Sequence, residues 1–358
     1  MNTINDNINY NINNNPSNQS IIFDKFGSIN IYYQSLNILR FDSFSFYSVD
    51  NTFSIFKSIN EHFYIIYTDL NKSLITFDLD VNKKLNEIKN AHNEYISNIR
   101  YYLDTNKKRD LIMSLSAKDN NLKLWDIEIL DCILNLKDVN LDGELYSACL
   151  LNDRNKYYII TSKYFWINVT YENIKIFDLE GNKVKEINES DDNTYFIDSY
   201  YDENLSKNYI ITGNEGYTKS YDYNTNTLYF MYIDIDSIGE NRSIIINKYE
   251  GITELMESCM DGIIRIWNFH SGELLNKIKI SENWLYGLCL WDNKYLMVGC
   301  SDKTIKVIDL KSLKVTKNII GFNEFVLTLK SIVHPKFGHC LISQGYGKEG
   351  ITFIKNIK

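Results

Sequence analysis

Histidine and cysteine are the residue types of this sequence best suited to metal binding or acid–base chemistry, and they are scattered along the chain. The six cysteines form no C-x-x-C pair; they are Cys132, Cys149, Cys259, Cys289, Cys300 and Cys340. Three residues, His334, His339 and Cys340, could meet across a hairpin as part of a metal site. No fourth ligand is evident, so we interpret the two histidines as residues that cap a loop. The sequence therefore predicts no metal ion and no other cofactor.

A glycine-rich run, Gly345-Tyr-Gly-Lys-Glu-Gly350, matches the pattern G-x-G-x-x-G. In a dinucleotide-binding fold this pattern follows a strand and opens a helix, whereas here another strand-like run follows. The sequence also contains no G-x-S-x-G nucleophile motif. We therefore interpret the run as a hairpin turn and predict no catalytic residues and no enzymatic activity.

Charge and hydropathy limit the partners of the chain. The formal net charge is −8, and no cluster of Lys and Arg stands out, which argues against nucleic acid as a partner. No segment approaches the roughly 18 apolar residues of a membrane-spanning helix. Five of the cysteines lie within apolar runs, as is typical of buried thiols in a reducing compartment. We expect a cytoplasmic protein that binds neither nucleic acid nor membranes.

The first 20 residues differ in composition from the rest of the chain. They include nine Asn and few large apolar residues. Such a tract buries too little apolar surface to offset the entropy lost on ordering. We predict a disordered tail over residues 1–20 and a single folded domain over residues 21–358.

The strongest pattern is a short strand ending that occurs seven times. Each copy places a large apolar residue at the same position, and Asp follows that residue in five copies. The position is held by Phe77, Trp125, Phe177, Tyr221, Trp267, Ile308 and Ile354. Successive positions lie 41 to 52 residues apart. A period of about 45 residues with four short strands per unit is typical of the blades of a β-propeller.

The predicted fold is all-β: a seven-bladed β-propeller of four-stranded antiparallel blades. The seventh unit lacks an outer strand, whereas a strand-like run over residues 29–37 has no place in the first unit. We predict that this N-terminal run completes the last blade and closes the ring, which removes two free sheet edges. Residues 44–50 are then expected to form the inner strand of the first blade.

The chain resembles the WD-repeat family of β-propellers. The residues that carry the resemblance are 121–126, 261–267 and 301–309, where an Asp-containing turn precedes the repeated apolar position. The resemblance implies a hydrogen-bonded network within the second blade that includes His92, Asp119 and Trp125. Ser114 or Ser116 would supply the hydroxyl group of this network. These roles are structural.

The resemblance also indicates which residues a partner would contact. Residues just before the turn acid are candidates: Lys118, Asn214, Met260 and Ser301. Tyr164, Phe165 and Trp166 lie in a segment longer than its counterparts and could form either an exposed hairpin or part of a blade interface. Trp284 precedes an inner strand near the central channel, and core packing is the alternative interpretation for it.

The resemblance implies a rigid scaffold that docks other proteins or peptides on its faces, as a monomeric propeller within a larger complex. One alternative is a substrate-recruiting adaptor of an assembly such as a ubiquitin ligase. A second is a propeller enzyme, which requires convergent acid–base or metal-binding residues at the channel. The available His and Cys do not recur at such positions.

Overall fold

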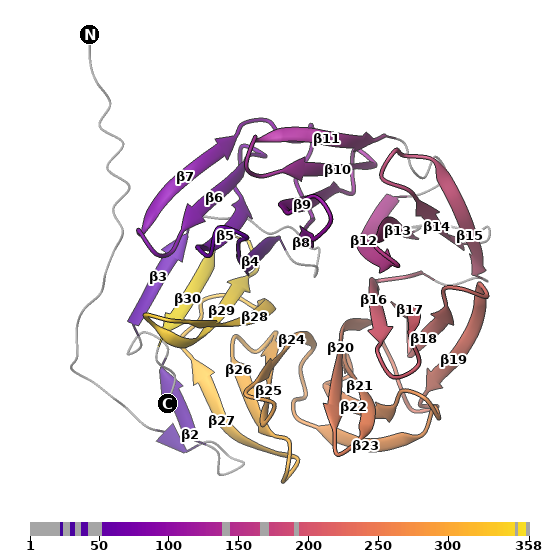
Figure 1. Cartoon of the computed structure of the whole chain (residues 1–358). Coiled ribbons are helices and arrows are strands. Elements are labelled where there is room, and N and C mark those ends of the chain that lie inside the picture. The colour runs from indigo at the N-terminus through magenta and orange to yellow at the C-terminus, as the bar shows by residue number, and fades with distance from the viewer. Residues whose placement is uncertain are drawn as a thin grey trace.

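The repeated unit of the sequence forms a four-stranded antiparallel sheet, and seven such sheets are arranged as a ring (Figure 1). The computed structural model describes residues 52–137, 144–164, 172–189, 193–347 and 350–355, and the backbone of residues 22–23, 29–32 and 37–41. Within these residues the regular elements are all strands. The prediction of a seven-bladed β-propeller is therefore confirmed. The predicted disordered tail, residues 1–20, lies outside the described residues.

The four strands of each blade follow one another from the centre of the ring outwards. The inner strands are β4 (Phe53–Lys57), β8 (Asn98–Asp104), β12 (Glu144–Asp153), β16 (Phe196–Asp202), β20 (Asn241–Tyr249), β24 (Leu285–Trp291) and β28 (Val326–His334). The second strands are β5 (Phe63–Thr68), β9 (Arg109–Ser116), β13 (Lys156–Tyr164), β17 (Lys207–Gly213), β21 (Ile252–Cys259), β25 (Tyr295–Cys300) and β29 (Gly338–Gly345).

The third strands carry the repeated ending; they are β6 (Leu74–Asp78), β10 (Asn121–Asp126), β14 (Glu172–Phe177), β18 (Tyr217–Asp222), β22 (Ile263–Asn268), β26 (Ile305–Asp309) and β30 (Ile351–Lys355). The outer strands are β7 (Lys83–Ile88), β11 (Asp131–Leu136), β15 (Lys183–Glu189), β19 (Thr227–Ile233), β23 (Leu274–Lys279), β27 (Lys314–Ile320) and, in blade 7, β3 (Asn37–Phe41).

An N-terminal strand closes the ring, as predicted, but it is not the run that the sequence suggested. Strand β3 pairs antiparallel with β30 and completes blade 7. Among the described residues of the predicted run, 29–37, only Asn37 belongs to β3; β2 (Ile29–Tyr32) pairs parallel with β27, and β1 (Ile22–Phe23) pairs with β2. Blade 6 is therefore extended to six strands. Neighbouring strand-like runs have similar local patterns, so only the tertiary pairing decides which of them closes the ring.

The inner strand of blade 1 also begins later than predicted. Residues 44–50 lie outside the described residues, and β4 takes the inner position by pairing with β5. Phe53 and Phe56 of β4 are buried. Both segments are short and rich in aromatic residues, and the pattern alone does not distinguish them.

The repeated apolar position has a shared geometry. In six blades the pairing between the third and outer strands shifts register immediately before that residue, for example between Leu124 and Trp125. A β-bulge of this kind bends and twists the strand locally. The sequence repeat thus corresponds to a repeated bulge.

The apolar core is divided into clusters that join neighbouring blades. One cluster, for example, contains Phe53 and Phe77 of blade 1 together with Ile342 and Phe353 of blade 7. None of the six cysteines forms a disulfide, and five are buried, as expected for small apolar side chains. Because the core lies between blades, each blade is stabilised by its two neighbours.

Candidate functional site

The network expected in blade 2 is assembled around a buried serine. Ser114 Oγ accepts a hydrogen bond from Trp125 Nε1 at 2.8 Å and lies 2.8 Å from His92 Nε2. His92 Nδ1 lies 3.7 Å from an Asp119 carboxylate oxygen, and that oxygen accepts the backbone N–H of Asn93. The structure places the hydroxyl of this network at Ser114. The group joins the second and third strands of one blade to the segment that precedes its inner strand.

The electrostatics of this network also indicate a structural role. Burial lowers the pKa of His92, so the ring is neutral near pH 7. Burial alone would raise the pKa of Asp119, but hydrogen bonding and charge from His92 hold it below its ordinary value. His92, Ser114 and Trp125 are almost inaccessible to solvent. A substrate therefore has no access to the network.

Blade 5 contains a related network that sequence reasoning missed. Trp267 Nε1 donates to Glu257 Oε1 at 3.1 Å, so a carboxyl group takes the role that Ser114 has in blade 2. Thr218 Oγ1 and Asn241 Nδ2 donate to Glu257 Oε2 at 2.5 and 3.0 Å. Burial raises the pKa of Glu257 to about 7. The signal available in the sequence was a glutamate directly after Leu255-Met256 in the second strand.

Four inner strands contain a bulge near their first residues, at one face of the ring. Register shifts in β12, β20, β24 and β28 leave residues unpaired with the second strand at this end. The residues inside these bulges include Tyr146, Arg242, Tyr286 and Leu327. Bulges at such positions redirect side chains without disturbing the rest of a sheet. Side chains from blades 3, 5, 6 and 7 are thereby displayed at one end of the molecule.

One half of this surface is organised around Arg242. Its Nη1 donates to the Tyr146 hydroxyl at 2.8 Å, and its guanidinium lies 5.0 Å from the centre of the Tyr195 ring. The rings of Tyr146 and Tyr195 meet edge to face, with centroids 6.1 Å apart. Arg242 also pairs with Glu240. The planar guanidinium is therefore held in place by three blades.

The other half is apolar. Tyr286 and Leu327 are buried against each other and against Phe325 and Tyr346, which are partly exposed. Burial raises the pKa of Tyr286 to about 12. Arg242, Tyr146 and Tyr346 have smaller electrostatic effects on the same pKa, so the two halves of the surface lie near one another. We call the residues that follow the aromatic entrance: Tyr146, Tyr195, Arg242, Trp284, Tyr286, Phe325 and Tyr346.

Trp284 is the most accessible large side chain of the aromatic entrance. It immediately precedes β24, and its backbone carbonyl accepts the N–H of Ser301 at 3.0 Å. Its side chain remains 49% exposed, so the alternative of core packing is wrong for this residue. An exposed Trp is among the side chains most often used by surfaces that bind another protein.

The remaining predicted contact residues lie apart from one another on the ring. Lys118 is exposed, and Met260 and Ser301 are half-buried. Asn214 is fully buried: its Oδ1 accepts from Thr212 Oγ1 at 2.9 Å, so its prediction as a contact residue is corrected. The side chain of Tyr164, together with Phe165 and Trp166, lies outside the described residues.

A hollow of about 400 Å³ lies along the inner strands of blades 4 to 7. Its lining is largely apolar and includes Tyr200, Ile245 and Leu290. The only carboxylate that lines it among the described residues is Asp198, which pairs with Arg100 at 2.9 Å. The lining therefore lacks the pair of acid and base groups that hydrolytic chemistry requires.

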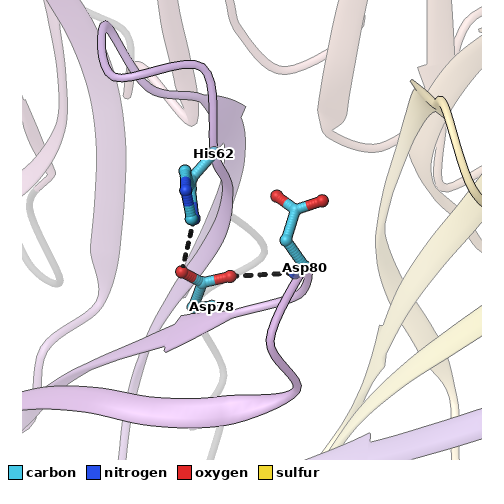
Figure 2. Close-up of side chains that lie close together, drawn as sticks. All are labelled: His62, Asp78 and Asp80. Carbon is cyan, nitrogen blue, oxygen red and sulfur yellow. Dashed lines mark hydrogen bonds and ion pairs between the residues drawn. The ribbon is translucent and has the colours of Figure 1, made fainter.

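A second group of polar side chains lies at the seam between blades 1 and 7 (Figure 2). His62 Nδ1 is 2.8 Å from Asp78 Oδ2, and Asp78 Oδ1 accepts the N–H of Asp80 at 2.8 Å. One ligand atom from each of these three residues lies within 4.8 Å of the others. This group is not evident from the sequence, because His62 lies 16 residues before Asp78 and 18 residues before Asp80.

The alternative site at His334, His339 and Cys340 is not assembled. His334 Nε2 faces Asp80, whereas His339 Nδ1 lies 2.9 Å from Asp292 and its ring stacks on Trp291 at 3.6 Å. His334 Nδ1 accepts the N–H of Lys336, which is the loop-capping role expected for it. The turn expected at the glycine-rich run is present between β29 and β30.

The ring of seven sheets defines the class of protein: a seven-bladed β-propeller with a repeated strand ending. A segment of 67 residues is 22% identical to the U3 small nucleolar RNA-associated protein 21 homolog of Schizosaccharomyces pombe. The match covers 19% of this chain and 7% of that protein. No protein-family model matches the chain. The fold and this similarity are consistent with the WD-repeat family of β-propellers.

Among the described residues, no helix has the length and apolar character needed to cross a membrane.

Proposed function

We propose that this protein is a non-catalytic scaffold and that it docks a partner protein or peptide at the aromatic entrance. The single observation that carries the proposal is the exposed Trp284, which directly precedes β24 at the face of the ring where the fixed Tyr, Phe and Arg side chains lie. Trp, Tyr and Arg are the residue types that contribute most to binding energy in protein interfaces.

The rigidity of the site supports the same proposal. The bulges that present Tyr146, Arg242 and Tyr286 belong to inner strands, which are held by their second strands and by neighbouring blades. A side chain that is already ordered loses less entropy when a partner binds. Hydrogen bonding to Tyr146 and stacking on Tyr195 order Arg242 before any partner arrives.

A place in an RNA-associated assembly is a second candidate, and the name of the S. pombe relative favours it. The net charge of −8 favours contact with a protein component of such an assembly over direct contact with RNA. The unpaired cysteines agree with a reducing compartment, which includes the nucleus as well as the expected cytoplasm.

The proposal is tested by affinity purification of the tagged full chain followed by quantitative mass spectrometry. Trp284→Ala is compared with Tyr201→Ala, because Tyr201 is an aromatic residue of similar exposure, 50%, near the opposite end of an inner strand. We expect Trp284→Ala to reduce recovery of the bound partners at least tenfold, and Tyr201→Ala to leave recovery unchanged.

Two outcomes contradict the proposal. The first is equal recovery of partners with wild type and Trp284→Ala. The second is a large drop in the melting temperature of Trp284→Ala, since that would make Trp284 a packing residue. Replacement of Tyr164, Phe165 and Trp166 in the same assay tests the other predicted contact segment. Recovery of ubiquitin-ligase subunits would identify the chain as an adaptor.

A further inference from the structure

The acid that ends a third strand has two roles in the blades. In blades 2 and 4 one carboxylate oxygen of Asp126 or Asp222 accepts backbone N–H groups of the following turn. The other oxygen pairs with the cation that begins the second strand: Arg109 with Asp126 at 3.4 Å, and Lys207 with Asp222 at 2.8 Å. The repeat therefore places a basic residue and an acid together in these blades.

Blade 1 departs from this arrangement at the cation. His62 stands where blades 2 and 4 have Arg109 and Lys207, so a metal-ligating imidazole replaces a cation. A second carboxylate, Asp80, lies beside Asp78; at the same position blade 2 has Glu128 and blade 4 has Asn224. The side chain of His62 is 45% exposed and that of Asp78 only 5%, so the group is open to solvent on one side.

We propose that His62, Asp78 and Asp80 bind a divalent transition-metal ion, for which Zn²⁺ is the best match. The three ligand atoms already lie within 4.8 Å of one another, close enough to converge on one ion after small side-chain rotations. One imidazole with two carboxylates suits zinc, and a water molecule completes four-coordination at such sites. In blades 4 and 2 the positions equivalent to His62 are held by Lys207 and Arg109, whose positive charges prevent the binding of a metal cation.

The protein also provides the contacts that orient the ligands. Asp78 Oδ1 accepts the N–H of Asp80 and of Val81, which leaves Oδ2 directed at His62. Asp80 Oδ2 accepts the N–H of Phe63 at 2.8 Å. Metal-binding carboxylates are ordinarily held by hydrogen bonds of this kind.

His334 connects this group to the neighbouring blade. It belongs to β28 of blade 7, and its Nε2 lies 3.2 Å from Asp80 Oδ1. Because its Nδ1 accepts the N–H of Lys336, the neutral ring carries its proton on Nε2 and donates toward Asp80. An ion held by Asp80 would therefore strengthen the seam between the first and last blades.

Metal binding exchanges one interaction for two. The hydrogen bond between His62 Nδ1 and Asp78 Oδ2 is replaced by one bond from each atom to the ion. A neutral imidazole that binds the ion through Nδ1 carries its proton on Nε2, so a proton that starts on Nδ1 moves to Nε2 by exchange with water.

The test uses the purified full chain without a polyhistidine tag, stripped of metal by a chelator. Zn²⁺ alone is titrated in competition with a chromophoric zinc indicator, and stoichiometry and affinity are measured. We expect one Zn²⁺ per chain and a higher melting temperature with zinc than without. Mg²⁺ at the same concentration should not compete, since it disfavours imidazole ligands.

Variants separate metal binding from a purely structural role. His62→Lys restores the cation found in blades 2 and 4, so it should retain the melting temperature of the metal-free protein yet lose zinc affinity at least tenfold. Asp80→Asn should lose a similar amount. His270→Ala is the matched control. His270 Nε2 also pairs with a carboxylate, Asp202, at 2.8 Å, but among the described residues no second carboxylate joins this pair as a possible metal ligand.

The inference is overturned if the wild-type chain binds no zinc at micromolar concentrations. It is equally overturned if one zinc per chain binds but His62→Lys and Asp80→Asn bind it as tightly as wild type. In the first case His62 only replaces the cation of the other blades. In the second case the zinc is held by other residues. Neither result affects the proposed docking at the aromatic entrance, which lies at other residues.

Discussion

Replacement of the buried Glu257 by Gln should change how the stability of the propeller depends on pH. Glu257 is 1% exposed and accepts hydrogen bonds from Trp267, Thr218 and Asn241. Gln has nearly the same shape, can accept the Trp267 N–H through its carbonyl oxygen, and carries no charge. The variant therefore removes the ionisation while it keeps the packing.

The size of the effect follows from the pKa of the carboxyl group. Burial raises the pKa of Glu257 from 4.5 to about 7, although the nearby guanidinium of Arg265 opposes the shift and Asp261 adds to it. The folded state therefore binds more protons than the unfolded state between these two pH values, and stability falls as the pH rises through them. At 1.36 kcal/mol per pKa unit, wild type loses about 3 kcal/mol from this one group between pH 4.5 and pH 7.

The assay is urea-induced unfolding of wild type and Glu257→Gln, followed by tryptophan fluorescence, at several pH values from 5 to 8. We expect the free energy of unfolding of the variant, relative to that of wild type, to rise by about 2–3 kcal/mol over this range. Glu273→Gln, in the same blade but exposed, serves as the control and should follow the wild-type profile. Parallel pH profiles for wild type and Glu257→Gln would refute the reasoning, because they would mean that Glu257 ionises alike in the folded and unfolded chains.

Two further substitutions test other parts of the fold. Ser114→Ala leaves Trp125 Nε1 and His92 Nε2 buried without their shared partner, so it should lower the free energy of unfolding by about 2 kcal/mol; a loss below about 0.5 kcal/mol would count against the network. Gly299→Ala would place a Cβ atom 2.4 Å from the backbone oxygen of Val326 in the next blade, and the displacement should cost about 1–3 kcal/mol. An unchanged melting temperature for Gly299→Ala would show that blades 6 and 7 can separate without cost.

The local sequence pattern was sufficient to predict the repeated third strands. The seven apolar positions from Phe77 to Ile354 all lie in third strands, and the alternation around Trp125 corresponds to β10. Such positions are predictable because period-2 alternation and Asp-containing turns act over a few residues. The burial of five cysteines follows from the apolar runs that contain them.

The local sequence pattern did not decide which of two similar strand-like segments takes a given place in the fold. Residues 29–32 and 37–41 are both strand-like, but the first pairs with β27 and only the second completes blade 7. The aromatic entrance was missed for a related reason. Its members come from five blades, and Tyr146, Arg242 and Tyr286 reach it from bulges at the start of inner strands.

By itself, the sequence determined the number of blades, the position of each third strand and the ring as a whole, because one repeated unit cannot bury its apolar faces without neighbours on both sides. Only the tertiary structure decided which N-terminal strand closes the ring, which residues form the aromatic entrance, and that His62 meets Asp78 and Asp80. These are contacts between residues distant in the chain. Their partners depend on strand register and on the packing of one blade against the next, which no local pattern records.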